Sequence, residues 1–524
     1  MKLKTIYTIL GAFLLIAFAS CKKDLLSTNT NPTTVTGNNY DPNFLLTTAQ
    51  LMYTGSTDFG AENWTTEWGQ IAGFVQHVAS TNTGFYSGDK YLNAVGSFGV
   101  YFDHAYIYQV QPVVELYQLT LNKPAYANLH QMSRIMKALI FERLTDLYGD
   151  IPYFQAGLGY YTRVYAPAYD KQQDIYTDLL KEVSEATDSL DGNLDYPTGD
   201  VFYSALGTSQ IAEWKTFGYT LQLRMAMRLT KVDPTTAQAY VTKVQGLTMA
   251  SNADNAIVQH EVGNETQNRD SWSIIGNDPL DLKLCSTYID SLQAYNDPRL
   301  PMMSEITATV DTVSADQLGM PPGFIIGGTN PATDLTQTSS YPAAGLDGYS
   351  NLNDNILSYT APNLILTYAE SEFLLADAAK RWGIGNVSAA THYKNGVLAA
   401  ITQLASYGDA STISDDLAEA YYDANPYNDA NGLNQINTQF WLSTVMNEYE
   451  AWCNWRRTSS SANPNGYPVL IPTNYVGNVT GGTIPRRLAY PPSEKVTNGT
   501  NYNTAVSRLQ GGDKLTSRMW WDTE

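Results

Sequence analysis

Charged residues are scarce in this chain of 524 residues, and basic residues are scarcer than acidic ones. Asp, Glu, Lys and Arg together make up 16% of the sequence, against roughly 25% in an average soluble protein. There are 31 Lys and Arg against 51 Asp and Glu, which gives a formal net charge of −20. Nucleic acids and anionic lipids are bound through a surplus of basic groups. The composition therefore disfavours nucleic acid and anionic lipid surfaces as partners.

Cysteine and histidine are rarer still, with three Cys and five His. The sequence has no CxxC, no HExxH and no two His at i and i+4, which are the spacings of common metal sites. It also has no GxSxG, so a serine hydrolase would lack its nucleophile elbow. We therefore expect no metal, no cofactor and no enzymatic activity. Cys285 and Cys453 could pair in an oxidising compartment, but buried free thiols are the preferred interpretation.

Aromatic residues, by contrast, are abundant and skewed. They reach 12% of the chain, with 37 Tyr and 10 Trp against 15 Phe. Tyr and Trp combine a flat apolar face with a polar group, whereas a core alone would favour Phe. With 43% apolar residues the chain can bury a sizeable core, and the composition excludes collagen-like, coiled-coil and wholly disordered proteins.

Apolar runs long enough to span a membrane are absent, but the first 20 residues are typical of a secretory signal peptide. Lys2 and Lys4 precede an uncharged, mostly apolar run of 13 residues from Ile6 to Phe18, which is shorter than the roughly 20 residues of a transmembrane helix. Small residues lie directly before Cys21, as in a bacterial lipobox, where the thiol of the first mature residue carries a lipid. We expect a lipid on Cys21; an ordinary signal peptide with an incidental Cys is the alternative.

The remainder divides into a short tether and one long domain. Residues 21–39 are rich in Ser, Thr, Asn and Gly, a composition that behaves as a flexible linker. Residues 40–524 are predicted to form a single domain. The tether would hold this domain off a membrane surface.

Helical periodicity is the main pattern within the predicted domain. Apolar residues recur at steps of three or four most clearly in 128–148, 211–229 and 366–382, and Gly149 and Gly383 are expected to end two of these helices. Weaker helical segments are 43–54, 62–79, 99–119, 171–190, 234–247, 279–294, 386–405 and 434–451. Consecutive helices with short links predict an all-α protein of packed helical hairpins. Three segments, 250–278, 304–360 and 458–504, are predicted to be irregular, and loops this long are usually functional.

One helical segment carries a resemblance to a known family. Residues 134–156, RIMKALIFERLTDLYGDIPYFQA, resemble the most typical segment of the SusD/RagB family of Bacteroidetes outer-membrane lipoproteins, and LTDLYGDIPY is its specific part. Further matches follow in the order of the family: EWKTFGYTLQLRMAMRL, AESEFLLADAAKRWG, TQFWLSTVMNEYEAWCNWRRT, PRRLAYPPSE and the closing WWD. The resemblance spans nearly the whole mature chain and is closest to the second SusD-like subgroup.

The resemblance implies both a fold and a role. The fold would be all-α, with tetratricopeptide-like helix pairs forming a superhelical half beside a looped, ligand-facing half. The role would be that of a non-catalytic cell-surface lipoprotein of the outer membrane, which captures oligosaccharides and delivers them to a TonB-dependent, SusC-like barrel transporter. Two alternatives stay open: the same role with peptide ligands, and an extracytoplasmic glycan-active hydrolase.

The acidic residues of the motifs are interpreted as structural. Asp146 and Asp150 flank Tyr148-Gly149, and two such carboxylates could indicate glycosidase chemistry. An Asp at a helix end can instead accept backbone N–H bonds, and this is the preferred interpretation. Seven further charged residues are expected to form buried ion pairs, which need matched partners: Arg224, Arg228, Arg456, Arg457, Glu370, Glu372 and Asp377.

Aromatic residues in the predicted loops are the candidates for ligand contact. Neutral sugars offer apolar C–H faces to aromatic rings and hydroxyls to amides and guanidinium groups. Trp64, Phe85 and the neighbouring Tyr86 lie near such loops, and 268–272 brings an amide, a guanidinium and an indole together. The residues predicted to contact an oligosaccharide are Tyr86, Tyr91, Asn268, Arg269, Trp272 and Tyr349. For each aromatic residue taken singly, core packing is the competing interpretation, and it is preferred for Trp214, Trp382, Trp441, Trp452, Trp455 and Trp520.

Overall fold

The computed structural model describes residues 40–56, 60–263, 266–275, 282–464, 466–468, 470 and 475–524. Residues Asn43–Glu524 group as one compact unit and Met1–Pro42 as another. The predicted signal peptide, the lipid site at Cys21 and the tether lie outside the described residues.

Helices account for most of the unit Asn43–Glu524. The longer α-helices are α3 (Asn43–Tyr53), α5 (Val95–His104), α6 (Gln111–Thr120), α7 (Ala127–Tyr148), α9 (Gln172–Ser189), α10 (Gln210–Arg228), α11 (Pro234–Val244), α13 (Ser286–Ala294), α15 (Tyr368–Trp382), α16 (Ala389–Thr402), α17 (Asp415–Ala424), α18 (Gly432–Ser443), α19 (Glu448–Thr458) and α21 (Gly499–Arg508). Short α-helices are α4 (Ala72–Phe74), α8 (Gly159–Thr162), α12 (Arg269–Ile275), α14 (Leu300–Met303) and α20 (Pro492–Thr497). Two π-helices, η1 (Asn63–Ile71) and η3 (Ala105–Val110), continue directly into α4 and α6.

Single 3₁₀ turns are scattered through the connections. They are η2 (Gly88–Lys90), η4 (Pro124–Tyr126), η5 (Ser204–Ser209), η6 (Asn252–Asp254), η7 (Pro331–Thr333), η8 (Leu335–Gln337), η9 (Gly345–Gly348), η10 (Gln403–Tyr407), η11 (Asp409–Ser411) and η12 (Asp429–Asn431).

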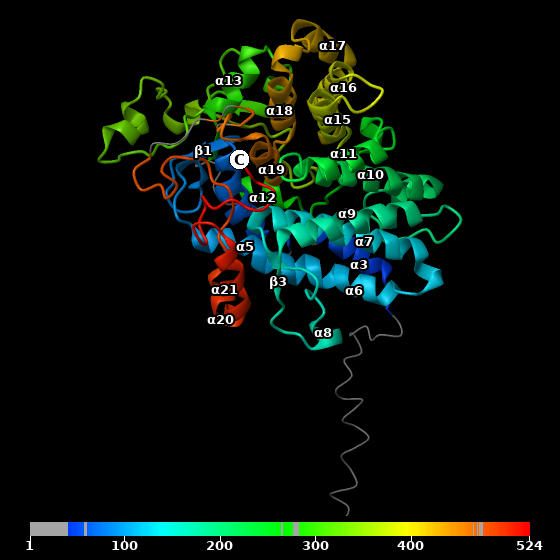
Figure 1. Ribbon diagram of the computed structural model, residues 1–524. Helices are drawn as coiled ribbons and strands as arrows, with labels where there is room; N and C mark the ends of the chain where they lie inside the picture. Colours follow the sequence, from blue (N-terminus) through cyan, green and yellow to red (C-terminus); the bar gives the residue numbers. More distant parts are fainter. Residues whose placement is uncertain are drawn as a thin grey trace, which may run out of the picture. The chain divides into compact units, whose positions relative to one another are not determined.

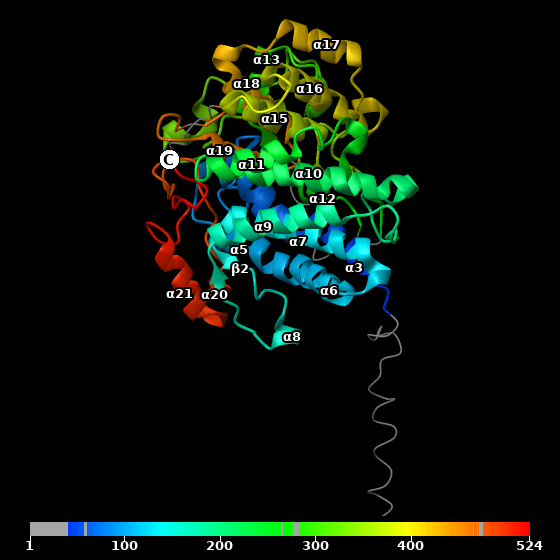
Figure 2. The same ribbon diagram turned by 45° about the vertical axis from the view of Figure 1, so that its right-hand side comes forward.

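Consecutive helices pack against one another along the chain. Helix α6 packs on α7, α7 on α9, α9 on α10 and α10 on α11, and α15 then packs on α10, α16 and α18. Figures 1 and 2 show these helices as a stack that runs from α3 and α6 at one end to α16 and α17 at the other. The irregular segments and the C-terminal region lie beside the stack. The predicted all-α class, helix pairs beside a looped half, is confirmed.

Local sequence explains where the main helices begin and end. The side chain of Thr367 accepts the backbone N–H of Glu370 and so caps α15, and Asp233 caps α11 in the same way before a Pro at its first position. Gly149 and Gly383 end α7 and α15 with φ of 84° and 64°, values that favour glycine. Both helix ends were predicted from the sequence.

The strands are short and pair only in twos. They are β1 (Val78–Ser80), β2 (Ile151–Pro152), β3 (Tyr169–Asp170), β4 (Ala256–Val258), β5 (Leu282–Leu284), β6 (Ser304–Ile306), β7 (Ser350–Leu352) and β8 (Asn363–Leu366). The pairs β1–β5, β2–β3, β4–β8 and β6–β7 are all antiparallel. Val78 lies opposite Leu284 in the first pair, and Ser304 lies opposite Leu352 in the last. These ladders join segments that are up to 206 residues apart in sequence, as Val78 and Leu284 are.

Several sequence-based boundaries were wrong. The predicted helix 434–451 is two helices, because the chain turns at Met446, whose φ is 75°. Within 279–294 the helix begins only at Ser286, since 282–284 pair as β5. Two segments predicted to be irregular contain helices: α12 lies in 250–278, and α20 with the first part of α21 lies in 458–504.

The core is continuous across the helix stack and includes most of the Trp residues expected there. Trp214, Trp441, Trp452 and Trp455 are buried, whereas Trp382 and Trp520 are only partly buried. Cys285 and Cys453 are free and buried, as preferred from the sequence. Among the described residues, no helix combines the length and the apolar character needed to cross a membrane.

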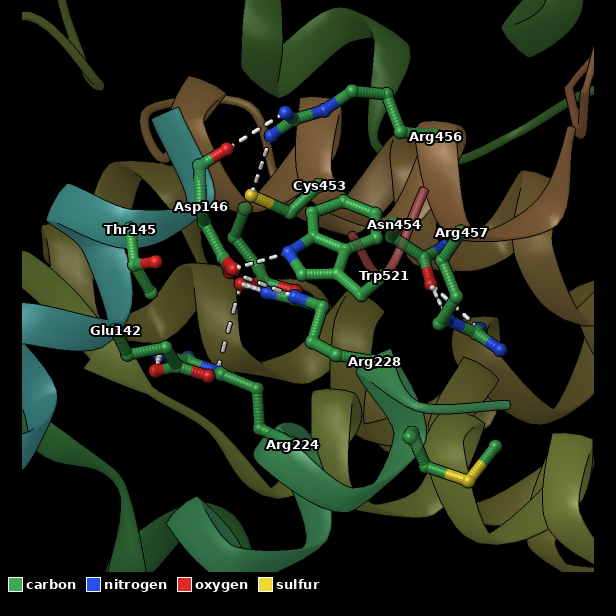
Figure 3. A network of polar contacts seen from close by, with 12 residues as sticks. Glu142, Thr145, Asp146, Arg224, Arg228, Cys453, Asn454, Arg456, Arg457 and Trp521 are labelled. Atoms are coloured by element: carbon green, nitrogen blue, oxygen red, sulfur yellow. Dashed lines mark hydrogen bonds and ion pairs between the residues drawn. The ribbon is translucent and has the colours of Figure 1, made fainter. Parts of the chain in front are cut away.

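A network of buried charges lies where α7, α10 and α19 meet (Figure 3). The Asp146 carboxylate accepts hydrogen bonds from Arg228 Nε at 2.9 Å, from Trp521 Nε1 at 2.8 Å and from Tyr176 OH at 2.5 Å. Arg228 also pairs with Glu450. Each of these side chains is buried, so every charge in the network depends on its partners.

The other predicted ion pairs form, except at Glu372 and Arg456. Arg224 binds Glu370 through two hydrogen bonds, from Nε at 2.5 Å and from Nη2 at 2.7 Å. Arg457 contacts Asp377 at 3.2 Å. Glu372 instead pairs with His392, 2.9 Å away, and Arg456 donates to backbone carbonyls, that of Asp146 among them.

Replacing Asp146 with Ala should lower the free energy of unfolding by about 3–5 kcal/mol, because it removes one of the two carboxylates that bind the buried Arg228 and leaves the Tyr176 hydroxyl and the Trp521 indole N–H without their acceptor. The measurement is chemical denaturation followed by Trp fluorescence. Asp188→Ala is the control: its ion pair with Lys243 is half-exposed, so the loss should be under about 1 kcal/mol. Equal effects of the two substitutions would contradict the structural role of Asp146.

Candidate ligand-binding site

Two aromatic rings stack face to face at the irregular half of the molecule. Trp64 in η1 and Phe85, in the loop between β1 and η2, have ring centroids 4.8 Å apart and an interplanar angle of 22°. Phe85 is 50% exposed and Trp64 is partly buried. The pair therefore presents a flat apolar surface to solvent, which is the geometry that an aromatic face needs to bind a sugar ring.

Hydrogen bonds connect this pair to α12. Trp64 Nε1 donates to Tyr86 OH at 2.8 Å, and Tyr86 OH donates to the carbonyl oxygen of Ser273 at 3.4 Å. Trp272, the neighbour of Ser273, is partly buried. Helix α12 and η1 thus form the walls of one site.

A buried carboxylate fixes α12 against η1. Asp270 accepts hydrogen bonds from Asn63 Nδ2 at 2.8 Å, Trp68 Nε1 at 3.0 Å and Asn363 Nδ2 at 2.7 Å. Burial raises the pKa of Asp270, and the three N–H donors act in the opposite direction. Burial and the neighbouring Asp270 charge also hold the pKa of Glu67 well above its usual value. Hydrogen bonds from η1 and β8 therefore hold the buried Asp270 carboxylate in place.

The loop that carries Phe85 lies directly on η1 because glycines permit a close approach. A Cβ on Gly88 would lie 1.9 Å from the carbonyl oxygen of Gln70, and one on Gly69 would lie 2.9 Å from that of Phe85. Gln70 Nε2 donates to the Phe85 carbonyl at 2.8 Å and to Ser87 Oγ at 3.3 Å. The position of the Phe85 ring is therefore set by backbone contact with η1.

The aromatic residues predicted to contact ligand differ in exposure. Trp272 keeps part of its surface open to solvent. Tyr86 is only 3% exposed and acts as the hydrogen-bonded link between Trp64 and α12. Tyr91 and Tyr349 are fully buried: Tyr91 packs against Phe74, and Tyr349 lies in a small cluster and donates to the Ser340 carbonyl at 3.1 Å. The prediction for Tyr91 and Tyr349 needs correction, because a ring without exposed surface cannot stack on a sugar.

The prediction that Asn268 and Arg269 contact the ligand also needs correction. Both residues are buried at the start of a helix rather than exposed in a loop. Asn268 Oδ1 accepts the N–H of Ser271 at 2.8 Å, and its Nδ2 donates to the carbonyl of Ala361 at 2.9 Å. The Cβ of Arg269 packs so closely on Gly55 and Gly60 that a Cβ on either would come within 2.8 Å of it. The Asn268 amide and the aliphatic part of the Arg269 side chain therefore hold α12 in place.

The sequence pointed to Trp64 and Phe85 as aromatic loop neighbours but did not select them. In the pair Phe85-Tyr86 the candidate named from the sequence was Tyr86. The structure exposes Phe85 and buries Tyr86, since the Tyr86 hydroxyl finds its partners inside. Which of two adjacent rings faces solvent depends on those distant partners and has no local signal.

The carboxylates considered for glycosidase chemistry are occupied elsewhere. Asp146 belongs to the buried ionic network, and Asp150 accepts the N–H of Gln172 at 2.9 Å and pairs with Arg508. Among the described residues, no group of three or more His, Cys, Asp or Glu side chains is placed to hold a metal ion.

Replacing Gly88 with Ala should lower the unfolding free energy by about 1–3 kcal/mol, because the added methyl collides with the backbone of Gln70. Thermal unfolding monitored by calorimetry measures this. Gly96→Ala in α5 is the matched control, since a Cβ there meets no atom within 4 Å and the helix gains propensity. If Gly88→Ala were as stable as Gly96→Ala, the close approach of the loop to η1 would be refuted.

Comparisons with known proteins give a consistent result. Residues 37–491 match the model of a SusD-like family described as starch-binding and associating with the outer membrane. A solved structure of a chitin-binding protein is 32% identical over 92% of this chain and 100% of its own, with a TM-score of 0.78. A SusD-like protein of Bacteroidetes AC2a is 26% identical over 93% and 100% of the two chains, with a TM-score of 0.77.

A third structure, a chitin-binding SusD homologue from Flavobacterium johnsoniae, shares the fold. It is 22% identical over 92% of this chain and 98% of its own, with a TM-score of 0.71. No curated protein sequence matches the chain.

Proposed function

The chain belongs to the SusD-like family of starch-binding proteins that associate with the outer membrane, and from this premise we propose that it is a non-catalytic glycan-binding protein of the outer membrane. It captures oligosaccharides at the surface formed by Trp64, Phe85 and Trp272, and it delivers them to a TonB-dependent barrel transporter.

The stacked pair of Trp64 and Phe85 is the observation that carries the glycan proposal. A half-exposed ring backed by a second ring is a rigid apolar platform that loses little side-chain freedom on binding. The indole of Trp64 is already held by Tyr86, so the platform is formed before a ligand arrives. The chitin-binding relative at 32% identity supports a glycan as the ligand.

The partners of the two carboxylates in the family motif, Asp146 and Asp150, support a non-catalytic role. Asp146 is buried among its ionic partners and Asp150 is paired with Arg508, so neither is available as a general acid. The hydrolase alternative therefore receives no support from these residues.

We further propose that a lipid on Cys21 attaches the protein to the outer membrane and that the protein delivers its ligand to a transporter there. A tether of residues 21–39 could reach at most ~60 Å if fully extended, so an anchored domain stays close to barrels in the same membrane. The net charge of −20 makes direct adhesion to an anionic lipid surface unfavourable. A protein partner rather than lipid is the more suitable contact for the folded unit.

Phe85→Ala and Trp272→Ala should each weaken glycan binding by about 1–2 kcal/mol, or roughly five- to thirtyfold in Kd, because each removes apolar surface from the ligand contact. Isothermal calorimetry against chito-, cello- and malto-oligosaccharides measures this.

Tyr160→Ala is the control for these variants, since Tyr160 is an 88% exposed aromatic residue on α8, away from η1 and α12. Wild-type affinity in both site variants, with unchanged thermal stability, would place the glycan site elsewhere. Binding to peptides but to none of the glycans would favour the alternative ligand class, and release of shortened glycans would overturn the non-catalytic assignment.

The anchor and the transporter are tested together in cells. Wild-type protein extracted in mild detergent should copurify with a large outer-membrane barrel. In a strain that lacks this barrel, the lipid on Cys21 would be the only remaining attachment to the membrane. Cys21→Ala removes that attachment, so the variant should leave the membrane fraction. Recovery of the free protein alone contradicts the transporter complex, and full membrane retention of the variant contradicts the anchor.

A further inference from the structure

A cavity of about 200 Å³ lies among the short strands of the irregular half, against η1 and α12. It is lined by residues from η1, β1, α12, β5, β6 and β7 and from the segments that follow β6 and β7. Its volume is several times the roughly 30 Å³ that a water molecule occupies in the liquid. The cavity can therefore take a chemical group larger than solvent.

The floor and the rim of this cavity differ in chemistry. Its buried floor is made mostly by apolar side chains, those of Trp68, Val78, Ile274, Leu282, Leu284, Leu352 and Leu357, and the buried Lys283 of β5 also lines the cavity. The rim is polar and reaches solvent, and it is made by Glu305, Thr307, Asn351 and Asp354. Burial and the Asp354 carboxylate raise the pKa of Glu305. A group that fits must thus bring an apolar end for the floor and hydrogen-bond donors for the rim.

The cavity shares its walls with the proposed glycan surface. Trp68 follows Trp64 at i+4 in η1, and Ile274 follows Ser273, whose carbonyl accepts the Tyr86 hydroxyl. The Asp270 carboxylate holds these two walls together, because it binds Trp68 Nε1 from within α12. A sugar on the aromatic pair therefore lies next to the elements that line the cavity.

We propose that this cavity binds the acetamido group of an N-acetylated amino sugar, so that the protein selects chitin-type glycans over glucans; this inference rests on the glycan-binding function proposed above. The acetyl methyl would fill the dry apolar floor, where burial of a methyl group is favourable. The amide N–H would donate to the carboxylates and the amide oxygen of the rim. Glucose carries a hydroxyl at the same carbon, which leaves the floor empty.

The acidic rim raises a second possibility that the experiment must separate. Glu305 and Asp354 would also attract the ammonium group of deacetylated glucosamine. That cation would gain from the rim but not from the floor, so its binding would weaken with added salt and would be insensitive to the size of the floor. Binding through the acetyl methyl would instead be insensitive to added salt and would weaken when the floor becomes smaller.

The experiment is calorimetric titration of the wild-type protein with the tetramers of N-acetylglucosamine, glucosamine and β-1,4-linked glucose. We expect the N-acetylglucosamine tetramer to bind at least about tenfold more tightly than the other two, which is the discrimination that one apolar group in a fitted pocket supplies. Leu357→Phe, which adds volume to the floor, should remove most of this preference while leaving the affinity for the glucose tetramer within about twofold.

A second variant guards against a folding defect in Leu357→Phe. Asp354 is exposed, so Asp354→Asn should fold normally, and it should weaken the N-acetylglucosamine tetramer several-fold without changing the glucose tetramer. Asp316→Asn, an exposed carboxylate outside the cavity, is the matched control and should change neither.

The outcomes separate the two proposals. Binding of all three tetramers without preference, or equal losses for acetylated and glucose tetramers in Leu357→Phe and Asp354→Asn, overturns the acetamido site and leaves glycan binding intact. A preference for glucosamine that salt abolishes overturns it in favour of an ionic rim. Failure of the wild-type protein to bind any glycan refutes the proposed function itself.

Discussion

The contact of Arg228 with Asp146 and Glu450 is the constraint on which the helix stack depends. It joins α7, α10 and α19, which are distant in sequence, and Asp146 also receives Tyr176 from α9 and Trp521 from the C-terminal segment. Charges this deeply buried are tolerated only when each has its partner, so the network admits one arrangement of the helices. A slip of any helix would leave an ion without a counter-ion in a dry interior.

A second set of polar contacts transmits this arrangement to the irregular half. His77 Nδ1 lies 2.5 Å from Glu448 at the start of α19, and Trp441 Nε1 in α18 donates to the carbonyl of Val75 at 2.9 Å. Glu448 N–H in turn donates to Glu67 in η1 at 3.1 Å. The wall of the proposed glycan site is therefore attached to the same helices that the ionic network fixes.

This attachment explains how long loops can form a preformed binding surface. The loop with Phe85 has little regular structure, yet glycine contacts and Gln70 hold it on η1. Asp270 holds α12 on the opposite side by three hydrogen bonds. The aromatic pair and the cavity are thus both built on η1, and both are held by the contacts of η1 with α12.

The sequence by itself determined the most strongly periodic helices, the glycine ends of α7 and α15, and most of the charged residues that pair in the interior. These features follow from local periodicity, from glycine and capping residues, and from the rule that buried ions need counter-ions. The tertiary structure alone decided that Phe85 rather than Tyr86 faces solvent and that Asn268 caps α12. It also decided that an apolar cavity opens beside Trp68. The reason is that exposure and hydrogen-bond partners are set by segments far apart in the chain: the Tyr86 hydroxyl finds its acceptor at Ser273, 187 positions away, and no local pattern encodes that contact.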